Sequence, residues 1–390
     1  MRVHKILRQV WANCAAEIHV GRLRALMAAV DGLGWGGRLS VTGIGRGLRS
    51  ATVTKHSIKR VDRLMSNPRI WSERNAVFAS LAKCLLSGVP QPVIAVDWTQ
   101  LVNGFQALVA AVPLSGRAIP IYLEVHPEKL LGNAAVEDRF LGILKTLLPA
   151  GCRPIVVADA GYRTPFFESV LALGWDFLGR IRGNLTMHPV GKKEVTNASE
   201  LYGKATSRPK NLGSYKLCPR RHNFTARLVL FRKTKMRRRG CARKPHNRSQ
   251  RKAAQGWRDP WLLVTSLPLP AKKIVRLYAQ RMHIEETFRD TKNTRWGWSL
   301  RHARFGNAQR TTTLLLIAAL TTAAMTLLGH AIEARGLHRG YQANTSKTRV
   351  LSLVSLASQV VRHDQPVPIS IFEIRAEFRH IRESLRVAQA

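Results

Sequence analysis

The spacing of apolar and polar positions over the first 75 residues is that of helices. A helix is predicted over 12–30, ending at the glycines of 32–37. A short segment over 39–48 and a turn lead to a second helical pattern over 54–65, where Ile58, Val61, Leu64 and Met65 share one face. The pair Asn67-Pro68 ends this pattern, because proline cannot continue a helix.

From residue 90 the pattern becomes that of strands. Residues 92–96 form a continuous apolar run, as expected for a strand that is buried on both faces, and residues 153–158 are predicted to form a second buried strand. The series is completed by strands over 105–113, 118–125 and 176–180 and by helices over 133–148 and 164–173. Three strands, a helix, a strand, a helix and a strand form the order of a ribonuclease-H-like α/β core.

Beyond residue 181 the chain is basic and rich in strand patterns, with strands predicted over 224–231 and 260–265. A strong helix is predicted over 272–289, another over 311–337, and helices to the end of the chain. We therefore expect an α/β fold in four parts: a helical N-terminal domain, 1–75; a ribonuclease-H-like core, 90–180 and 267–305; a β-rich insertion, 181–266; and a helical C-terminal region, 306–390.

Composition adds a strong positive charge to this picture. The chain has 63 Lys and Arg against 23 Asp and Glu, a formal net charge of +40. Such an excess repels itself in the folded state and usually has a polyanionic partner, most often nucleic acid. Fifteen cations and no acid stand between Lys216 and Lys252. This segment is predicted to follow a DNA backbone, with Arg237, Arg238 and Arg239 at its centre; a solvated charge run is the alternative.

The basic helix over 54–65 gains a function from this charge. Its polar side carries cations such as Lys55 and Lys59, and a short helical segment precedes it. This arrangement is typical of helix-turn-helix-like DNA readers. A plain helical bundle with a solvated basic face is the alternative.

Two further features bear on the compartment. The five cysteines are odd in number and widely scattered, which fits a reduced cytoplasmic protein, and the loose spacing of Cys218-x3-His222 and Cys241-x4-His246 among many cations disfavours zinc. Residues 311–330 carry no full charge and are long enough to span a membrane. Six threonines dilute this stretch, so a buried core helix is predicted, with no membrane partner.

Acidic residues are scarce, so their positions are informative. Asp97 follows the apolar run that ends at Val96, and Asp159 follows the run that ends at Ala158. Both are expected at the carboxyl end of a buried strand, where ligands bind in open α/β sheets, although either alone could cap its strand. Together they indicate ligands for hard divalent cations. Two such ions about 4 Å apart can activate the attacking oxygen and stabilise the leaving oxygen in phosphoryl transfer.

A third acid lies in the helix predicted over 272–289. Steps of three and four residues place five polar side chains on one face if the helix continues: Tyr278, Arg281, Glu285, Arg289 and Lys292. Such a stripe is costly to pack but fits metal ions and phosphates, with Glu285 as a metal ligand and the cations on the DNA backbone. A salt-bridged surface helix is the alternative.

These residues resemble a known family. The spacing Tyr278-x2-Arg281-x3-Glu285-x6-Lys292 resembles the signature of bacterial insertion-sequence transposases of the insertion-sequence-four type, with every position matched. The segment Asp97-Trp98-Thr99 looks like the family's first aspartate block, and the segment from Asp159 to Arg163 looks like its second.

The resemblance implies a DDE transposase with a ribonuclease-H-like core that a β-rich insertion interrupts before the glutamate. It implies cut-and-paste transposition on two Mg²⁺ ions, with Mn²⁺ as a substitute. The partners implied are double-stranded DNA, as inverted repeats at the transposon ends and as target, and a second copy of the chain. The implied pathway runs through a DNA hairpin, and the implied location is the bacterial cytoplasm at the nucleoid.

Trp261, in the strand predicted before the signature, resembles a tryptophan with which relatives stack a base flipped from the transposon end. A role in the core of that strand is the alternative. Two other functions also stay open for the chain as a whole. One is a nuclease or resolvase on the same core that does not join strands, and the other is an inactive, DNA-binding transposase remnant.

Overall fold

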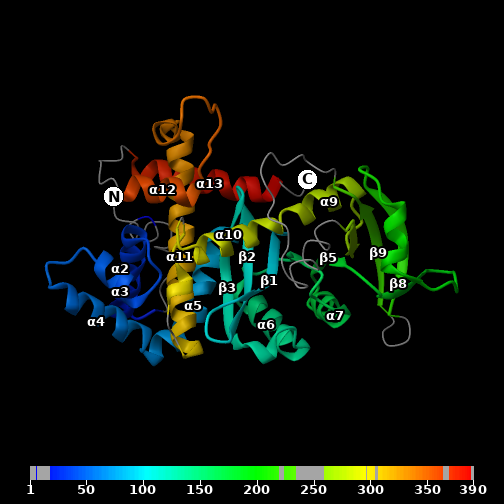
Figure 1. Cartoon of the computed structure of the whole chain (residues 1–390), viewed down its shortest axis with the longest axis horizontal. Helices are drawn as coiled ribbons and strands as arrows, with labels where there is room; N and C mark the ends of the chain where they lie inside the picture. Colours follow the sequence, from blue (N-terminus) through cyan, green and yellow to red (C-terminus); the bar gives the residue numbers. More distant parts are fainter. Residues whose placement is uncertain are drawn as a thin grey trace. The chain divides into compact units, whose positions relative to one another are not determined.

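The fold is mixed α/β and consists of two compact units (Figure 1). Unit 1 comprises residues 1–154 and 282–390, and unit 2 comprises residues 155–281. The computed structural model describes residue 6 and residues 18–218, 224–233, 259–295, 297–303, 306–362 and 369–387.

The sheet of unit 1 consists of three antiparallel strands in the order β3-β2-β1: β1 Val93–Gln100, β2 Phe105–Leu114 and β3 Arg117–Pro127. Asp97 lies opposite Val109, while Trp98 lies opposite Leu108, which in turn lies opposite Glu124. Because side chains alternate along a strand, Asp97 and Trp98 belong to opposite faces of this sheet, and Glu124 shares the face of Trp98.

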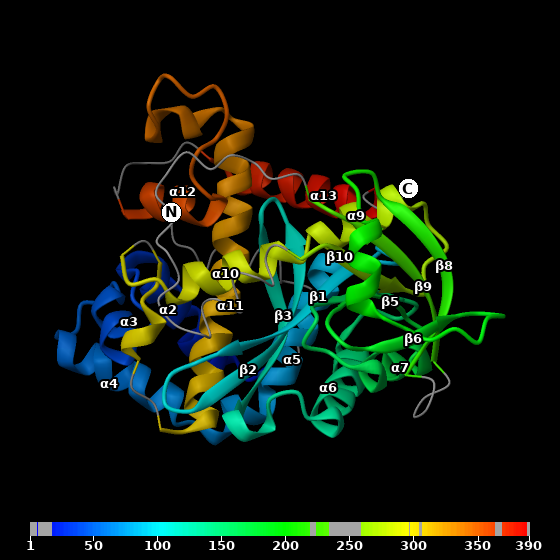
Figure 2. The same cartoon turned by 45° about the vertical axis from the view of Figure 1, so that its right-hand side comes forward.

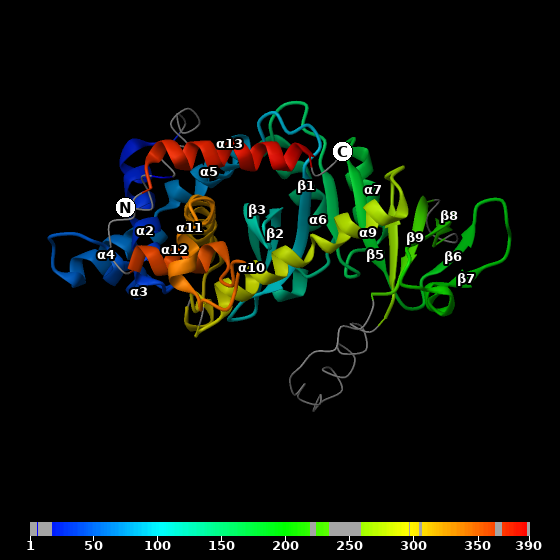
Figure 3. The same cartoon turned by 90° about the horizontal axis from the view of Figure 1, so that it is seen from above.

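Helices cover both faces of this sheet, with α5 Pro68–Leu86 and α10 Met282–Lys292 on opposite sides (Figure 3). On the first face, Phe78 of α5 and Phe140 of α6 Ala134–Leu147 pack against Tyr122, with ring centroids 5.7 and 4.8 Å away. On the second face, the Thr287 hydroxyl of α10 accepts a hydrogen bond from the Ala118 N–H at 2.8 Å and donates one to its carbonyl at 3.0 Å. The two helix layers therefore enclose the strand that carries Asp97.

The long helix α11 Ala308–Ala334 forms the core of the helical part of unit 1 (Figure 2). It contacts β3, α5, α2 Val20–Gly36, α12 Leu353–Arg362 and α13 Ile371–Val387. Its length and mean hydropathy of 1.8 suit a membrane span, yet 94% of its most apolar 18-residue stretch is buried inside the protein. Five of its threonine hydroxyls donate to the carbonyl four residues earlier, which satisfies them without an outside partner. The structure thus confirms the predicted buried core helix.

Three helices begin the described chain: α2 Val20–Gly36, α3 Val41–Gly47 and α4 Thr54–Met65. The helix α4 has the predicted bounds and buries Val61, Leu64 and Met65. The helix α2, however, runs through the first glycines of the cluster that was expected to end it. A Cβ on Gly32 would lie 2.5 Å from the Ile44 carbonyl oxygen, so this glycine lets α2 and α3 approach closely.

Unit 2 begins with the parallel strands β4 Ile155–Ala158 and β5 Asp176–Ile181, which α7 Thr164–Ala172 connects. Antiparallel strands then follow β5 in the order β10 Trp261–Thr265, β9 Phe224–Phe231, β8 Lys210–Leu217, β6 Thr186–Pro189 and β7 Thr196–Asn197. Short 3-10 helices, η1 to η4, cover Glu128–Leu130, Ala198–Lys204, Leu300–His302 and Leu337–Tyr341. The order β1-β2-β3-α6-β4-α7-β5 is the predicted element order.

The helix predicted over 272–289 is two helices, α9 Ala271–Ala279 and α10 Met282–Lys292. At the break, the N–H groups of Gln280 and Arg281 bond three residues back, to the carbonyls of Leu277 and Tyr278, both at 3.1 Å. These tight bonds replace the regular α-helical ladder. Unit 2 ends at Arg281, so the five signature-helix residues do not share one continuous helical face as the sequence suggested.

Candidate active site

Asp97 lies inside strand β1 rather than after it. The apolar run ends at Val96, but β1 continues to Gln100, where it still pairs with Gln106 of β2. The prediction of a strand-end position was therefore wrong for Asp97, because strand pairing extends β1 beyond its apolar residues. The side chain stays half-buried, on the face of the sheet that α10 covers.

A pocket of about 480 Å³ in unit 1 brings Asp97 together with Glu285. Its polar wall comes from β1, from α10 and from the segment after α10, and includes Asp97, Thr99, Glu285, Arg289, Lys292 and Arg301. Residues 285, 289 and 292 follow steps of four and three, so α10 turns all three toward this pocket. Two carboxylates and three cations thus meet in one concave site.

Lys292 is held within this pocket by a hydrogen bond. Its Nζ donates to Thr99 Oγ1 at 2.6 Å. Burial and the nearby Arg301 lower the pKa of Lys292 to about 8, while Asp97 opposes the shift. The ammonium group therefore keeps its charge at neutral pH and is placed to meet a phosphate. Arg289 differs, because its exposed guanidinium pairs with Glu286 on the same helix at 2.8 Å.

The opposite face of the same sheet carries a second set of acids, which sequence reasoning missed. Glu124 pairs with Tyr122 at 2.6 Å, with His126 at 2.8 Å and with Arg139 at 3.0 Å. Burial would raise the pKa of Glu124, but these hydrogen bonds outweigh it and lower the pKa to about 2. The spacing of Tyr122, Glu124 and His126, two residues apart on one strand, was the available signal.

This network reaches the strand that carries Asp97. The Trp98 indole Nε1 donates to Glu137 Oε1 of α6 at 2.9 Å, and its ring meets His126 at 5.7 Å between centroids. Both Glu124 and Glu137 are buried, with 8% and 4% of their surface exposed. The residue next to Asp97 is therefore fixed by buried contacts.

In unit 2, Asp159 directly follows strand β4, as the sequence predicted. Its Oδ1 accepts a hydrogen bond from the Gly161 N–H at 2.6 Å, which orients the carboxylate at the end of the strand. The neighbouring Tyr162 is buried against Phe166, with centroids 4.3 Å apart, whereas Arg163 is exposed. Of the residues in this block, Asp159 and Arg163 are therefore accessible to a ligand.

Unit 2 also holds the first half of the signature. Tyr278 is buried in α9, and burial raises its pKa, with smaller effects from Arg281, Arg180 and Asp159. Its ring meets Trp261 edge-on at 5.0 Å between centroids. The charges of Arg281 and Asp159 therefore both act on the Tyr278 hydroxyl.

Arg180 belongs to the same part of unit 2 and was not singled out from the sequence. It is 5% exposed and donates from Nη2 to the carbonyls of Asp259 and Pro260, at 3.0 and 3.1 Å. Burial lowers its pKa. As a buried arginine beside Tyr278, it adds positive potential that a sequence pattern does not reveal.

Of the other predicted DNA-contacting residues, some lie within the described part of the chain and some lie outside it. Lys55 and Lys59 are exposed on α4. The three arginines at 237–239 lie outside the described residues, as do His222, Cys241 and His246.

The predicted metal ligands are divided between the units. Over the described part of the chain, groups of three or more His, Cys, Asp or Glu side chains able to hold a metal ion are absent. Unit 1 contributes Asp97 and Glu285 to one pocket, and unit 2 contains Asp159. The convergence of all three carboxylates stays a prediction.

The chain is basic, and two of its carboxylates line a pocket together with cations. The family described as Transposase DDE domain matches residues 90–322, and the chain belongs to this family of DNA-transposing proteins. The matched segment contains Asp97, Asp159 and Glu285. No curated protein matches the chain significantly.

Among solved structures, the chain is similar to the piggyBac transposase synaptic complex with hairpin DNA, determined by cryo-EM. The TM-score is 0.40 and the sequence identity 12%, over 97% of this chain and 82% of that one.

Proposed function

We propose that this protein is a cut-and-paste DNA transposase in which Asp97, Asp159 and Glu285 hold two Mg²⁺ ions, with Mn²⁺ as a substitute. One observation carries the proposal: Asp97 and Glu285, far apart in the sequence, line the same pocket as Lys292 and Arg289. The carboxylates can bind a metal ion, and the cations can bind the phosphate on which that ion would act.

The chemistry of the donors fits such ions. Carboxylate oxygens are hard ligands, which Mg²⁺ and Mn²⁺ prefer. When bound, the ions would supply Lewis-acid activation of the attacking oxygen and stabilisation of the leaving oxygen. The side chains of this protein would do the rest: Lys292 and Arg289 hold the DNA phosphates at the pocket, and Arg281, Tyr278 and Arg163 contribute from unit 2.

The proposed partners are the inverted repeats of a transposon, target DNA and a second copy of this chain. Exposed Lys55 and Lys59 on α4 support backbone contacts by a helix-turn-helix-like N-terminal domain, 1–75. The ribonuclease-H-like core over 90–180 and 267–305, with its insertion at 181–266 and the helical region 306–390, belongs to the same proposal. So does a place at the nucleoid in the bacterial cytoplasm.

Assignment to the insertion-sequence-four type predicts a hairpin intermediate that involves Trp261. Trp261 is half-buried and contacts Tyr278 and Phe231, with ring centroids 5.0 and 5.8 Å away. Stacking on a flipped base can contribute about 1–3 kcal/mol. Trp261→Ala should therefore leave the first nick nearly normal and slow hairpin formation, when both rates are measured on end-bearing DNA. Equal loss of both rates together with a lower Tm would assign Trp261 to the core instead.

A strand-transfer assay tests the function itself. The DNA flanking the gene supplies the substrate, because terminal inverted repeats there define the transposon ends. With Mg²⁺ and a target plasmid, the proposed transposase should both release the end-bearing fragment and join its 3′-ends to the target. Cleavage without joining would identify a nuclease or resolvase. Binding without cleavage, in Mg²⁺ and in Mn²⁺ alike, would identify an inactive remnant.

A further inference from the structure

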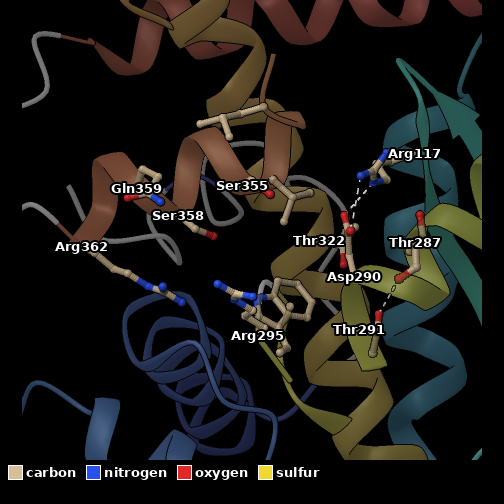
Figure 4. A pocket seen from close by; sticks show the side chains of 14 residues that line it. Arg117, Thr287, Asp290, Thr291, Arg295, Thr322, Ser355, Ser358, Gln359 and Arg362 are labelled. Atoms are coloured by element: carbon tan, nitrogen blue, oxygen red, sulfur yellow. Dashed lines mark hydrogen bonds and ion pairs between the residues drawn. The ribbon is translucent and has the colours of Figure 1, made fainter. Parts of the chain in front are cut away.

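A second pocket lies on another side of α10, also within unit 1, with a volume of about 340 Å³ (Figure 4). Thr287, Asp290 and Thr291 line it from α10, at positions between those that face the first pocket. The remaining walls come from Arg117, from the segment around Arg295 and from α11 and α12. One helix thus separates two pockets, and the proposed transposition chemistry uses only the first.

The charges of this second pocket are unevenly placed. Asp290 is the one acid among its described lining residues, and Arg117 engages it through Nε at 2.6 Å and Nη2 at 3.3 Å. Farther along, the guanidinium groups of Arg295 and Arg362 point toward one another from two sides of the pocket (Figure 4). Both arginines are exposed, and an anion placed between them would be attracted by both charges.

Arg362 is exposed and lies close to the end of α2. Its guanidinium lies against Gly37, where an added Cβ would come within 1.8 Å of Nη2. The last turn of α12 thus places this cation beside the αL cap of α2, at the pocket.

The walls of the pocket show what the anion should carry. Ser355, Ser358 and Gln359 of α12 also line the pocket with hydroxyl and amide groups (Figure 4). Leu351, Val354 and Trp298 supply an apolar side. An inorganic anion would leave that side unused, whereas a nucleotide has a phosphate for the arginines and a sugar and base for the apolar wall.

We propose that this pocket binds the phosphate of a nucleotide between Arg295 and Arg362, with Ser358 as an additional donor and the base toward Leu351 and Val354. The ligand is either a free mononucleotide or the terminal nucleotide of a DNA strand. The site uses none of the proposed metal ligands, so it does not depend on the transposase mechanism.

Titration calorimetry in EDTA with 150 mM salt tests the proposal on the full-length protein. The probes are dAMP, inorganic phosphate and a 5′-phosphorylated hexanucleotide. Against wild type, Arg295→Ala and Arg362→Ala should weaken nucleotide binding by about 10- to 100-fold, because each removes a charge-assisted contact. The matched control is Arg339→Ala, which removes an exposed arginine that does not line the pocket and should bind like wild type.

The outcomes separate the two sources of the ligand. Arginine-dependent binding of dAMP supports a free nucleotide, and arginine-dependent binding of the hexanucleotide alone supports a strand end. Inorganic phosphate binding as tightly as either probe overturns the nucleotide assignment. So does equal binding by wild type and Arg362→Ala.

A filling variant guards against misfolding. Ser358→Leu keeps both arginines and occupies the pocket, so it should also lose nucleotide binding while its Tm stays near that of wild type. If Ser358→Leu binds normally, the ligand lies elsewhere and the proposal fails.

Discussion

The two faces of the β1–β3 sheet both carry acids, but in different surroundings: a buried hydrogen-bond network on one face and an open pocket on the other. On the α6 face, Glu124 is saturated by Tyr122, His126 and Arg139, and Glu137 accepts from Trp98. On the α10 face, Asp97 and Glu285 line a pocket of about 480 Å³ together with cations. The strand β1 contributes to both faces through adjacent residues, Asp97 and Trp98.

The contrast shows how a protein with few acids divides them between structure and chemistry. A buried carboxylate whose oxygens are all hydrogen-bonded has no capacity left for a metal, and removing it leaves its partners buried and unsatisfied. A carboxylate that lines an open pocket can be reached by a ligand, and we expect its removal to disturb the fold less than the removal of a buried one. Activity and stability should therefore respond to different acids of the same sheet.

The largest effect is expected on catalysis. Asp97→Asn and Glu285→Gln should lower Mg²⁺-dependent DNA nicking on the order of 10³-fold or more, because each removes a metal ligand while keeping the side-chain shape. DNA binding in gel-shift assays should stay within about twofold of wild type. Glu128→Gln is the matched control, since Glu128 is an exposed acid of unit 1 that does not line the pocket. Nicking by Asp97→Asn at the control rate would refute the site.

The second effect is expected on stability. Glu124→Ala should lower the free energy of unfolding by about 2–5 kcal/mol, because it leaves the buried Tyr122 hydroxyl and His126 ring without their hydrogen-bond partner, at about 1–3 kcal/mol each. Asp97→Asn should change the same quantity by less than about 1 kcal/mol. Urea denaturation of both variants measures the difference. Similar losses of unfolding free energy in the two variants would mean that Asp97 contributes to stability as much as Glu124 does.

The pH dependence of stability sharpens the contrast further. The Glu124 pKa of about 2 lies below its ordinary value of 4.5. A lowered carboxyl pKa stabilises the fold above pH 4.5, and this contribution is lost as the pH falls through 2. Between pH 5 and pH 2, wild type should therefore lose on the order of 3 kcal/mol more than Glu124→Gln. Parallel stability curves for the two proteins would contradict the assigned hydrogen bonds.

The smallest effect concerns the cation of the α10 face. Lys292→Ala should weaken DNA binding and lower the slope of log affinity against log salt by roughly 0.9, the value for one phosphate contact. The free energy of unfolding should change by less than about 1 kcal/mol, because the variant loses one side-chain hydrogen bond to Thr99. An unchanged slope would assign Lys292 to orienting Thr99 rather than to holding DNA.

Local patterns were sufficient for much of this fold. The bounds of α4 and β9 agree with the prediction, because a one-sided helix and a short apolar strand are encoded in neighbouring residues. The element order from β1 to β5 followed from the same kind of pattern. Asp97 and Glu285 line one pocket, whereas their predicted convergence with Asp159 stays a prediction.

Features set by distant partners were not predictable. The extension of β1 to Gln100 depends on pairing with β2, and the break at Gln280–Arg281 coincides with the end of unit 2. The glycine at 32 looked like a helix terminator because its contact with Ile44 of α3 is not visible in the local pattern. The saturation of Glu124 needs Arg139 from another element, which no strand pattern contains.

The burial of α11 has a consequence for incomplete copies of this protein. Its neighbours α2, α5 and β3 are synthesised before it, but α12 and α13 come after it. A chain that stops between residues 335 and 352 would keep Asp97, Asp159 and Glu285 yet leave the α12 flank of the long apolar helix α11 uncovered. Uncovered apolar surface of this kind favours aggregation. Such a truncated product is expected to be removed as misfolded protein, so it would not accumulate as a competitor for the DNA that the full-length protein occupies.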